Sequence, residues 1–152
     1  MSAISEKVRN ALYAKLNVSG VTSLVGFYDA PTNTKGKIFE SLAPDDAATP
    51  YVIFGRQAPE PITYTMGPTQ WQESDLWLIK AVTDEDSDKD KGPQKLAEDI
   101  LAACVTALGT SLTLSGNEVV WFSRFSDMPP FQETLTDRTI YHRGMIWRIA
   151  VE

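Results

Sequence analysis

The feature that most constrains the fold is an alternating segment at residues 71–82, in which both series of side chains include several apolar residues. Successive side chains of a β-strand point to opposite faces of its sheet. The two series are Trp77, Ile79 and Ala81, and then Leu76, Leu78 and Val82. Helices on one side of a sheet would cover only one of them. The segment therefore predicts a long strand whose second face is covered by something else, and a neighbouring subunit is the natural candidate.

Helical spacing of apolar side chains occurs in two segments, one over residues 3–16 and the other between Pro93 and Gly109. Proline suits the first position of a helix, and glycine suits the position after its end. A shorter helical turn is expected from Ser19 until Gly26. The sequence thus predicts two main helices and one short one.

Strands are expected where β-branched and aromatic residues cluster between loop-forming residues. Besides residues 71–82, these segments are residues 37–40, 51–55, 119–122 and 139–151. Prolines 59 and 61 favour an extended arm or hairpin tip at residues 57–67, and the pair Pro129-Pro130 predicts a bend. The order of elements predicts an α+β fold, with a mainly antiparallel sheet of four to five strands and two helices packed on one face.

Length and composition narrow the class of protein. The chain has 152 residues, so residues 1–152 are expected to form a single domain with one core. A net charge of −6 without any block of Lys and Arg argues against nucleic acid as the main ligand. No apolar run approaches the ~18 residues of a membrane span, and the first residues carry an early acid rather than the apolar region of a secretion signal.

The residues that most often carry catalysis are scarce. The single cysteine, Cys104, lies on the apolar stripe of the second main helix, which predicts a buried and inert thiol. The single histidine, His142, lies inside an alternating strand, where a hydrogen-bonded polar side chain is expected rather than a catalytic base. No phosphate-binding loop or dinucleotide fingerprint occurs. We therefore expect no catalytic residue, no cofactor and no enzyme activity.

The acidic run at residues 84–91 invites comparison with a calcium loop. An EF-hand beginning at Asp84 would place Lys89 where the sharp turn needs glycine. It would also place Lys95 where the bidentate glutamate belongs. The run is therefore expected to be a solvated loop without a metal.

Large side chains beside loop segments, or on the second face of the strand at 71–82, are candidates for partner contacts. They are Tyr64, Met66, Trp71, Leu76, Leu78, Phe125 and Phe131. Aromatic residues and methionine are enriched in the cores of protein interfaces. These residues are the candidate subunit or tube interface, and the alternative that they fold back on their own domain stays open.

Several short motifs follow one another over nearly the whole chain. They are Ala11-Leu12-Tyr13-Ala14-Lys15-Leu16, Leu24-Val25-Gly26, Lys37-Ile38-Phe39, Pro50-Tyr51-Val52-Ile53-Phe54, the long strand, the second main helix, and Tyr141-His142-Arg143 through Trp147-Arg148-Ile149. In this order they resemble the tail-completion family of long-tailed bacteriophages, which includes tail terminators and tail-to-head joining proteins.

The resemblance implies a structural protein of the virion that forms a ring, typically a hexamer, in the neck at the top of the tail. The ring would end tail elongation and join the tail tube protein to the head-tail connector or stopper protein. DNA would meet it only in passage through the lumen. The resemblance implies assembly in the host cytoplasm and no membrane contact, cofactor or catalysis.

Three alternatives stay open from the residues themselves. The chain could be a small non-enzymatic protein-binding module, or another neck or tail tube component of the same particle. It could also be an enzyme that uses acids such as Asp45, Asp46 or Asp75, although no motif supports this beyond the presence of carboxylates.

Overall fold

The computed structural model describes residues 3–59 and 73–152. The elements in these residues are α1 (Ala3–Leu16), α2 (Ser19–Val25), β1 (Ile38–Glu40), β2 (Tyr51–Pro59), β3 (Glu73–Asp84), α3 (Pro93–Leu108), β4 (Val119–Thr134) and β5 (Thr139–Val151). The strands form one sheet in the order β1-β2-β3-β5-β4. Only β1 and β2 pair in parallel, and the other pairs are antiparallel. The expected α+β fold with a mainly antiparallel sheet is confirmed.

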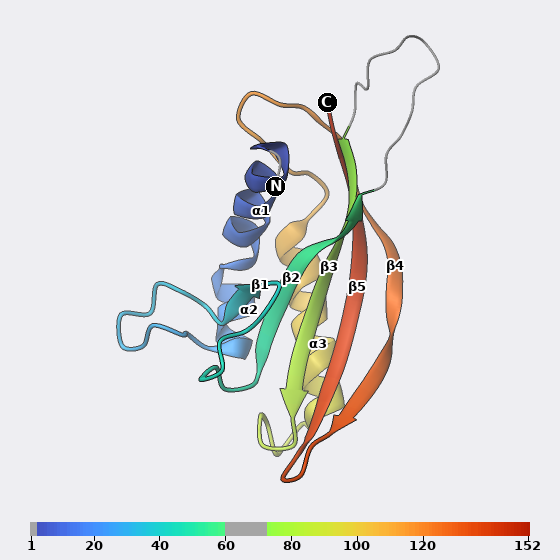
Figure 1. Cartoon of the computed structure of the whole chain (residues 1–152). Helices are drawn as coiled ribbons and strands as arrows, with labels where there is room; N and C mark the ends of the chain where they lie inside the picture. Colours follow the sequence, from blue (N-terminus) through green and yellow to red (C-terminus); the bar gives the residue numbers. More distant parts are fainter. Residues whose placement is uncertain (1–2, 60–72) are drawn as a thin grey trace.

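The helices pack against one face of this sheet (Figure 1), which we call the covered face. Its buried apolar sheet side chains are Ile38, Val52, Phe54, Trp77, Ile79, Ala81, Met145, Trp147, Ile149 and Val151. They meet the apolar stripes of α1 and α3, which carry leucines, a valine and an isoleucine at helical spacing. This contact forms the core, and it places Trp147 at 4% exposure, as the alternation of the last strand predicts.

The opposite side of the sheet, which we call the open face, carries no helix from the described part of the chain. The strand registers place on it Ile53, Leu76, Leu78, Lys80, Trp121, Phe125, Phe131, His142, Ile146 and Arg148. Among the described residues, the sheet thus has one face packed on helices and one face without a helix.

Several element bounds match the sequence prediction, and others differ. The helices at 3–16 and 93–108 and the last strand at 139–151 are confirmed, and α2 is a third helix of 7 residues. β2 continues to Pro59, beyond the expected end at residue 55. β4 continues for 16 residues through Pro129-Pro130 instead of ending before them.

The proline pair is tolerated because β4 lies at the edge of the sheet. Proline has no backbone N–H to donate to a neighbouring strand, so strands tolerate it at edges, where the N–H side can face solvent, and at bulges. The register of β4 against β5 shifts between Met128 and Phe131, around this pair. The expected bend is therefore an irregularity within a continuous strand.

None of the helices in the described residues is both long and apolar enough to cross a bilayer.

Candidate functional site

The centre of the open face is an apolar strip contributed by three neighbouring strands. Leu76 and Leu78 of β3 are half-buried, and Leu78 pairs in register with Ile146 of β5. On its other side Leu78 pairs with Gly55 of β2, and Ser41 lies against that glycine. The two leucines predicted as interface residues thus lie side by side on the uncovered side of the sheet.

Val82 corrects one expectation about this face. The sequence predicts that it is exposed together with the two leucines, but it is fully buried. Its register partners are Tyr51 of β2 and His142 of β5. The rings of these two neighbours flank the short valine side chain on both sides, and this explains why Val82 is buried at the end of the strip.

β4 adds three aromatic side chains along the edge of the open face. Trp121 is 53% exposed, Phe125 is 49% exposed and Phe131 is 46% exposed. The guanidinium of Arg148 lies 4.4 Å from the centroid of the Phe125 ring, within the range of a cation–π contact. These rings are exposed although neighbouring side chains hold them in place, which is typical of preformed interfaces.

His142 anchors one end of this aromatic row. Its imidazole stacks on Phe131 with ring centroids 4.2 Å apart, and Nε2 lies 3.2 Å from a carboxylate oxygen of Glu133. Nδ1 is buried and has no hydrogen-bond partner in the described residues, so the expected hydrogen bonding is found at one ring nitrogen and not at the other. Burial and then the nearby charge of Lys80 lower the pKa of His142, while Glu133 opposes this change.

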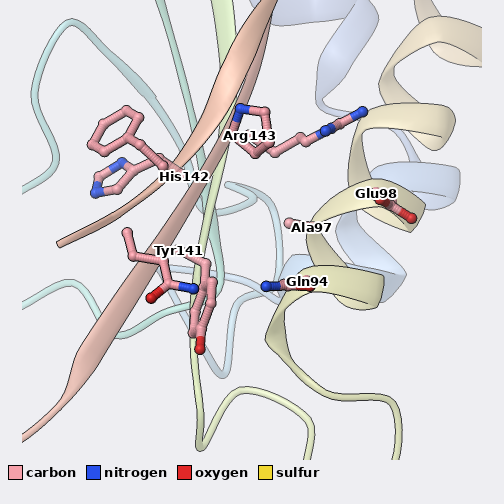
Figure 2. Close-up of a pocket in the computed structure, with 9 residues that line it drawn as sticks. Gln94, Ala97, Glu98, Tyr141, His142 and Arg143 are labelled. Atoms are coloured by element: carbon pink, nitrogen blue, oxygen red, sulfur yellow. The ribbon is translucent and has the colours of Figure 1, made fainter. Parts of the chain in front are cut away.

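A pocket of about 230 Å³ lies at the β4 edge of the sheet, between the first turns of α3 and the ends of β4 and β5. It is lined by Gln94, Ala97, Glu98, Pro130, Phe131, Gln132, Tyr141, His142 and Arg143. Figure 2 shows the side chain of Arg143 running alongside α3 and that of Gln94 pointing toward the strand, while His142 lies on the other side of β5. The carboxamides and the phenol both donate and accept hydrogen bonds, and the guanidinium only donates, so the pocket suits a polar group that can accept from Arg143.

The acids considered for catalysis have local structural partners or lie apart from this pocket. Asp75 is buried on the covered side, and its carboxylate accepts a hydrogen bond of 2.9 Å from Arg56. Asp46 accepts a hydrogen bond from the hydroxyl of Tyr28, and Asp45 is exposed in the same loop. The structure therefore does not bring these three carboxylates into one site.

The acidic turn after β3 uses its carboxylates to hold its own backbone. Asp84 accepts from the backbone N–H of Asp86 and from the hydroxyl of Ser87, and Asp88 accepts from two later backbone N–H groups. Such side-chain to backbone bonds are what Asp commonly forms in turns. In the described ranges no group of three or more His, Cys, Asp or Glu residues is placed to hold a metal ion.

Four of the predicted interface residues thus meet on the open face, namely Leu76, Leu78, Phe125 and Phe131. Tyr64, Met66 and Trp71 lie outside the described residues. Sequence reasoning missed Trp121, although its alternation with Phe122 indicated that one of the two had to face outward. It also missed Arg143, because nothing in the sequence marks the pocket around it.

No model of a known protein family matches the chain, and no curated protein matches it. A solved structure described as "Virion of native gene transfer agent (GTA) particle" contains a chain with a similar fold, with a TM-score of 0.68. The match covers 100% of this chain and 99% of that chain, at 19% sequence identity. The shared fold is that of a virion chain. At this identity the likeness concerns the fold alone.

Proposed function

We propose that this protein is a structural component of a long-tailed phage or phage-like particle and forms a ring at the top of the tail tube. The observation that carries the proposal is the open face, where half-buried aliphatic and exposed aromatic side chains lie together on one uncovered side of the sheet. The end-to-end match to a chain of a gene transfer agent virion supports it. So does the resemblance of the sequence motifs to the tail-completion family.

The physical case for a ring starts from the cost of leaving this face in water. Contiguous apolar patches on a soluble subunit commonly mark protein contacts, because burying them is favourable at roughly 25 cal/mol per Å². A head-to-tail contact that closes on itself gives every subunit two neighbours and leaves no free end. A closed ring therefore covers the patch in all copies at once.

A ring also accounts for the proposed role of ending the tail. One surface of the ring would match the last ring of the tail tube, while the opposite surface does not repeat it and instead meets the connector or stopper protein. Each copy has a net charge of −6, so the ring would repel DNA phosphates and let DNA pass without binding it. We propose a structural role without catalysis, because the pocket and the open face offer contacts rather than a nucleophile with its base.

Deletion of the gene from the phage tests this function. We expect DNA-filled heads and tails that remain separate, with many tails overlong, as seen by electron microscopy. Complementation with the wild-type gene restores joined particles, and so does the exposed control variant Glu6→Gln, whereas Leu78→Asp does not. Normal joined particles in the deletion mutant would refute the joining role. Complete loss of tails would point instead to a tube component.

A further inference from the structure

A second exposed apolar position lies at the opposite edge of the sheet from β4. Leu42, just after β1, is 79% exposed, the highest value among the large apolar side chains in the described residues. Asp45 and Asp46 follow it closely in the same loop. Because β1 and β4 are the two edges of the sheet, this loop and the aromatic row lie on opposite sides of one subunit (Figure 1).

The loop that carries Leu42 is fixed in place. The backbone N–H of Ser41 donates to the carbonyl of Phe54 at 2.8 Å, and the ammonium of Lys37 donates to the carbonyl of Ala48 at 2.9 Å. Ser41 adopts a φ of 62°, a conformation that is uncommon for residues other than glycine. Ser41 packs closely on Gly55, and a Cβ added at position 55 would lie 3.3 Å from the Ser41 hydroxyl oxygen. Leu42 is therefore held outward by an ordered loop.

The carboxylates of this loop differ in whether they have a partner. Asp46 accepts from the hydroxyl of Tyr28 at 3.0 Å. Asp45 is exposed and forms no side-chain hydrogen bond or ion pair within the described residues. The loop thus presents one apolar side chain and one unpaired carboxylate.

A cation that could pair with the Asp45 carboxylate lies in the pocket at the β4 edge of the sheet. The sequence has six arginines. Four of them pair with acids, namely Arg9, Arg56, Arg124 and Arg138. Arg148 lies over the Phe125 ring. Arg143 is half-buried in the pocket wall, and in the described part of the chain it forms neither an ion pair nor a hydrogen bond.

We propose that loop 42–46 of one subunit docks against the Arg143 pocket of the next subunit in the ring. Leu42 packs on the exposed rings of Pro130 and Phe131, and the Asp45 carboxylate binds the Arg143 guanidinium. This inference rests on the ring proposed above. The two surfaces differ and lie at opposite edges, so the contact is heterologous, which is the type that generates rings.

A carboxylate fits this pocket better than a phosphate does. One guanidinium matches one carboxylate through its two parallel N–H donors. Glu98 also lines the pocket, and its negative charge disfavours a doubly charged anion. The occupant is therefore a protein acid, and this chain presents such an acid next to an exposed leucine.

Cross-linking through engineered cysteines tests the contact directly. The double variant Leu42→Cys with Gln132→Cys should form a disulfide-linked ladder of oligomers under mild oxidation, in the presence of tail tubes. The matched control, Leu42→Cys with Ala102→Cys, moves the second thiol to the exposed outer side of α3 and should form no ladder. The native Cys104 is fully buried and does not compete.

Charge exchange provides the second measurement. Asp45→Arg and Arg143→Asp should each lower the fraction of assembled rings at least tenfold, and the combined variant should restore it. Lys7→Gln, which removes a cation whose partners are Ser115 and Asn117, away from both docking surfaces, should leave assembly unchanged. Circular dichroism on each variant confirms that the subunit is folded.

The outcomes separate the two proposals. A ladder together with rescue by charge exchange supports the docking contact. Rings without a ladder, or rings that both single charge variants leave intact, overturn this contact while the ring itself stands. A wild-type chain that stays monomeric with and without tail tubes overturns the ring and the contact with it.

Discussion

Leu78 and Ile79 are neighbours in β3 with the same number of carbon atoms, yet they lie in different environments. Ile79 is fully buried on the covered face, while Leu78 is half-buried on the open face. The same contrast separates Trp147, at 4% exposure, from Trp121, at 53%. Apolar content alone therefore does not show where the core lies. The side of the sheet decides, because within residues 3–59 and 73–152 only one side meets helices.

The open face is partly shielded by long polar side chains rather than by a second layer. The ammonium of Lys80 lies 5.9 Å from the Phe131 ring centroid, and Arg148 lies over Phe125. Lysine and arginine can cover apolar surface with their aliphatic stems while their charges stay in water. Such cover can be displaced by a partner, whereas the helices of the covered face cannot.

The largest expected effect is on the covered face. Trp147→Ala should lower the free energy of unfolding of the subunit by about 3–5 kcal/mol, as truncation of a large core side chain does. Trp121→Ala on the open face should cost less than about 1 kcal/mol in the isolated subunit, because half of that side chain is already in water. Urea titration of both variants measures the difference. Equal losses would show that the two faces are not distinct.

An aspartate introduced on the covered face should have a different effect from one introduced on the open face. Ile79→Asp should prevent folding, since an unpaired carboxylate would be buried among helices. Leu78→Asp should leave a folded subunit and lower assembly at least tenfold, about 1.4 kcal/mol of association free energy for each factor of ten. Circular dichroism reports folding, and sedimentation velocity reports assembly. A folded Leu78→Asp variant that assembles normally would remove the strip from the interface.

A smaller effect concerns pH. The pKa of His142 is lowered in the folded chain, mainly by burial and next by Lys80, with Glu133 acting in the opposite direction. The folded state therefore binds a proton less readily than the unfolded state does, so stability should fall as pH drops below about 6.5. Denaturant titrations between pH 5 and 7 measure this slope. The variant His142→Gln should show a flatter slope over the same range, and an unchanged slope would exclude His142 as its source.

The smallest effect is a reaction that should not occur. Burial raises the pKa of Cys104 to about 12, so the thiolate is scarce at neutral pH and the sulfur is inaccessible. A thiol reagent should label the folded chain only as fast as it unfolds and should label it promptly in denaturant. Rapid labelling at pH 8 without denaturant would show that the covered face opens.

The parts of the fold with local signals were predictable from the sequence. α3 is bounded by Pro93 and Gly109, and strict alternation defines β5, so both elements match their expected bounds. The length of β4 was not predictable, because Pro129-Pro130 reads as a break unless the strand is known to lie at an edge. That position is set by pairing with β5, which is a property of the folded chain.

Some residues of the candidate site were likewise predictable from the sequence, and others were not. Alternation placed Leu76 and Leu78 on the uncovered side, and loop-rich surroundings singled out Phe125 and Phe131. That Arg143 forms no ion pair or hydrogen bond within residues 3–59 and 73–152 could not be read from the sequence, because this depends on which acids the fold brings near. Arg143 and Leu42 are also far apart in the sequence, so the sequence could not indicate the proposed contact between their surfaces.

The irregular pairing of β4 affects whether folded subunits aggregate edge to edge at high concentration. Its register against β5 shifts at three places, and two prolines interrupt its donors. An exposed edge of this length would otherwise offer a template on which further chains could add without limit. With such an edge, newly made subunits can stay at high concentration without growing into fibres.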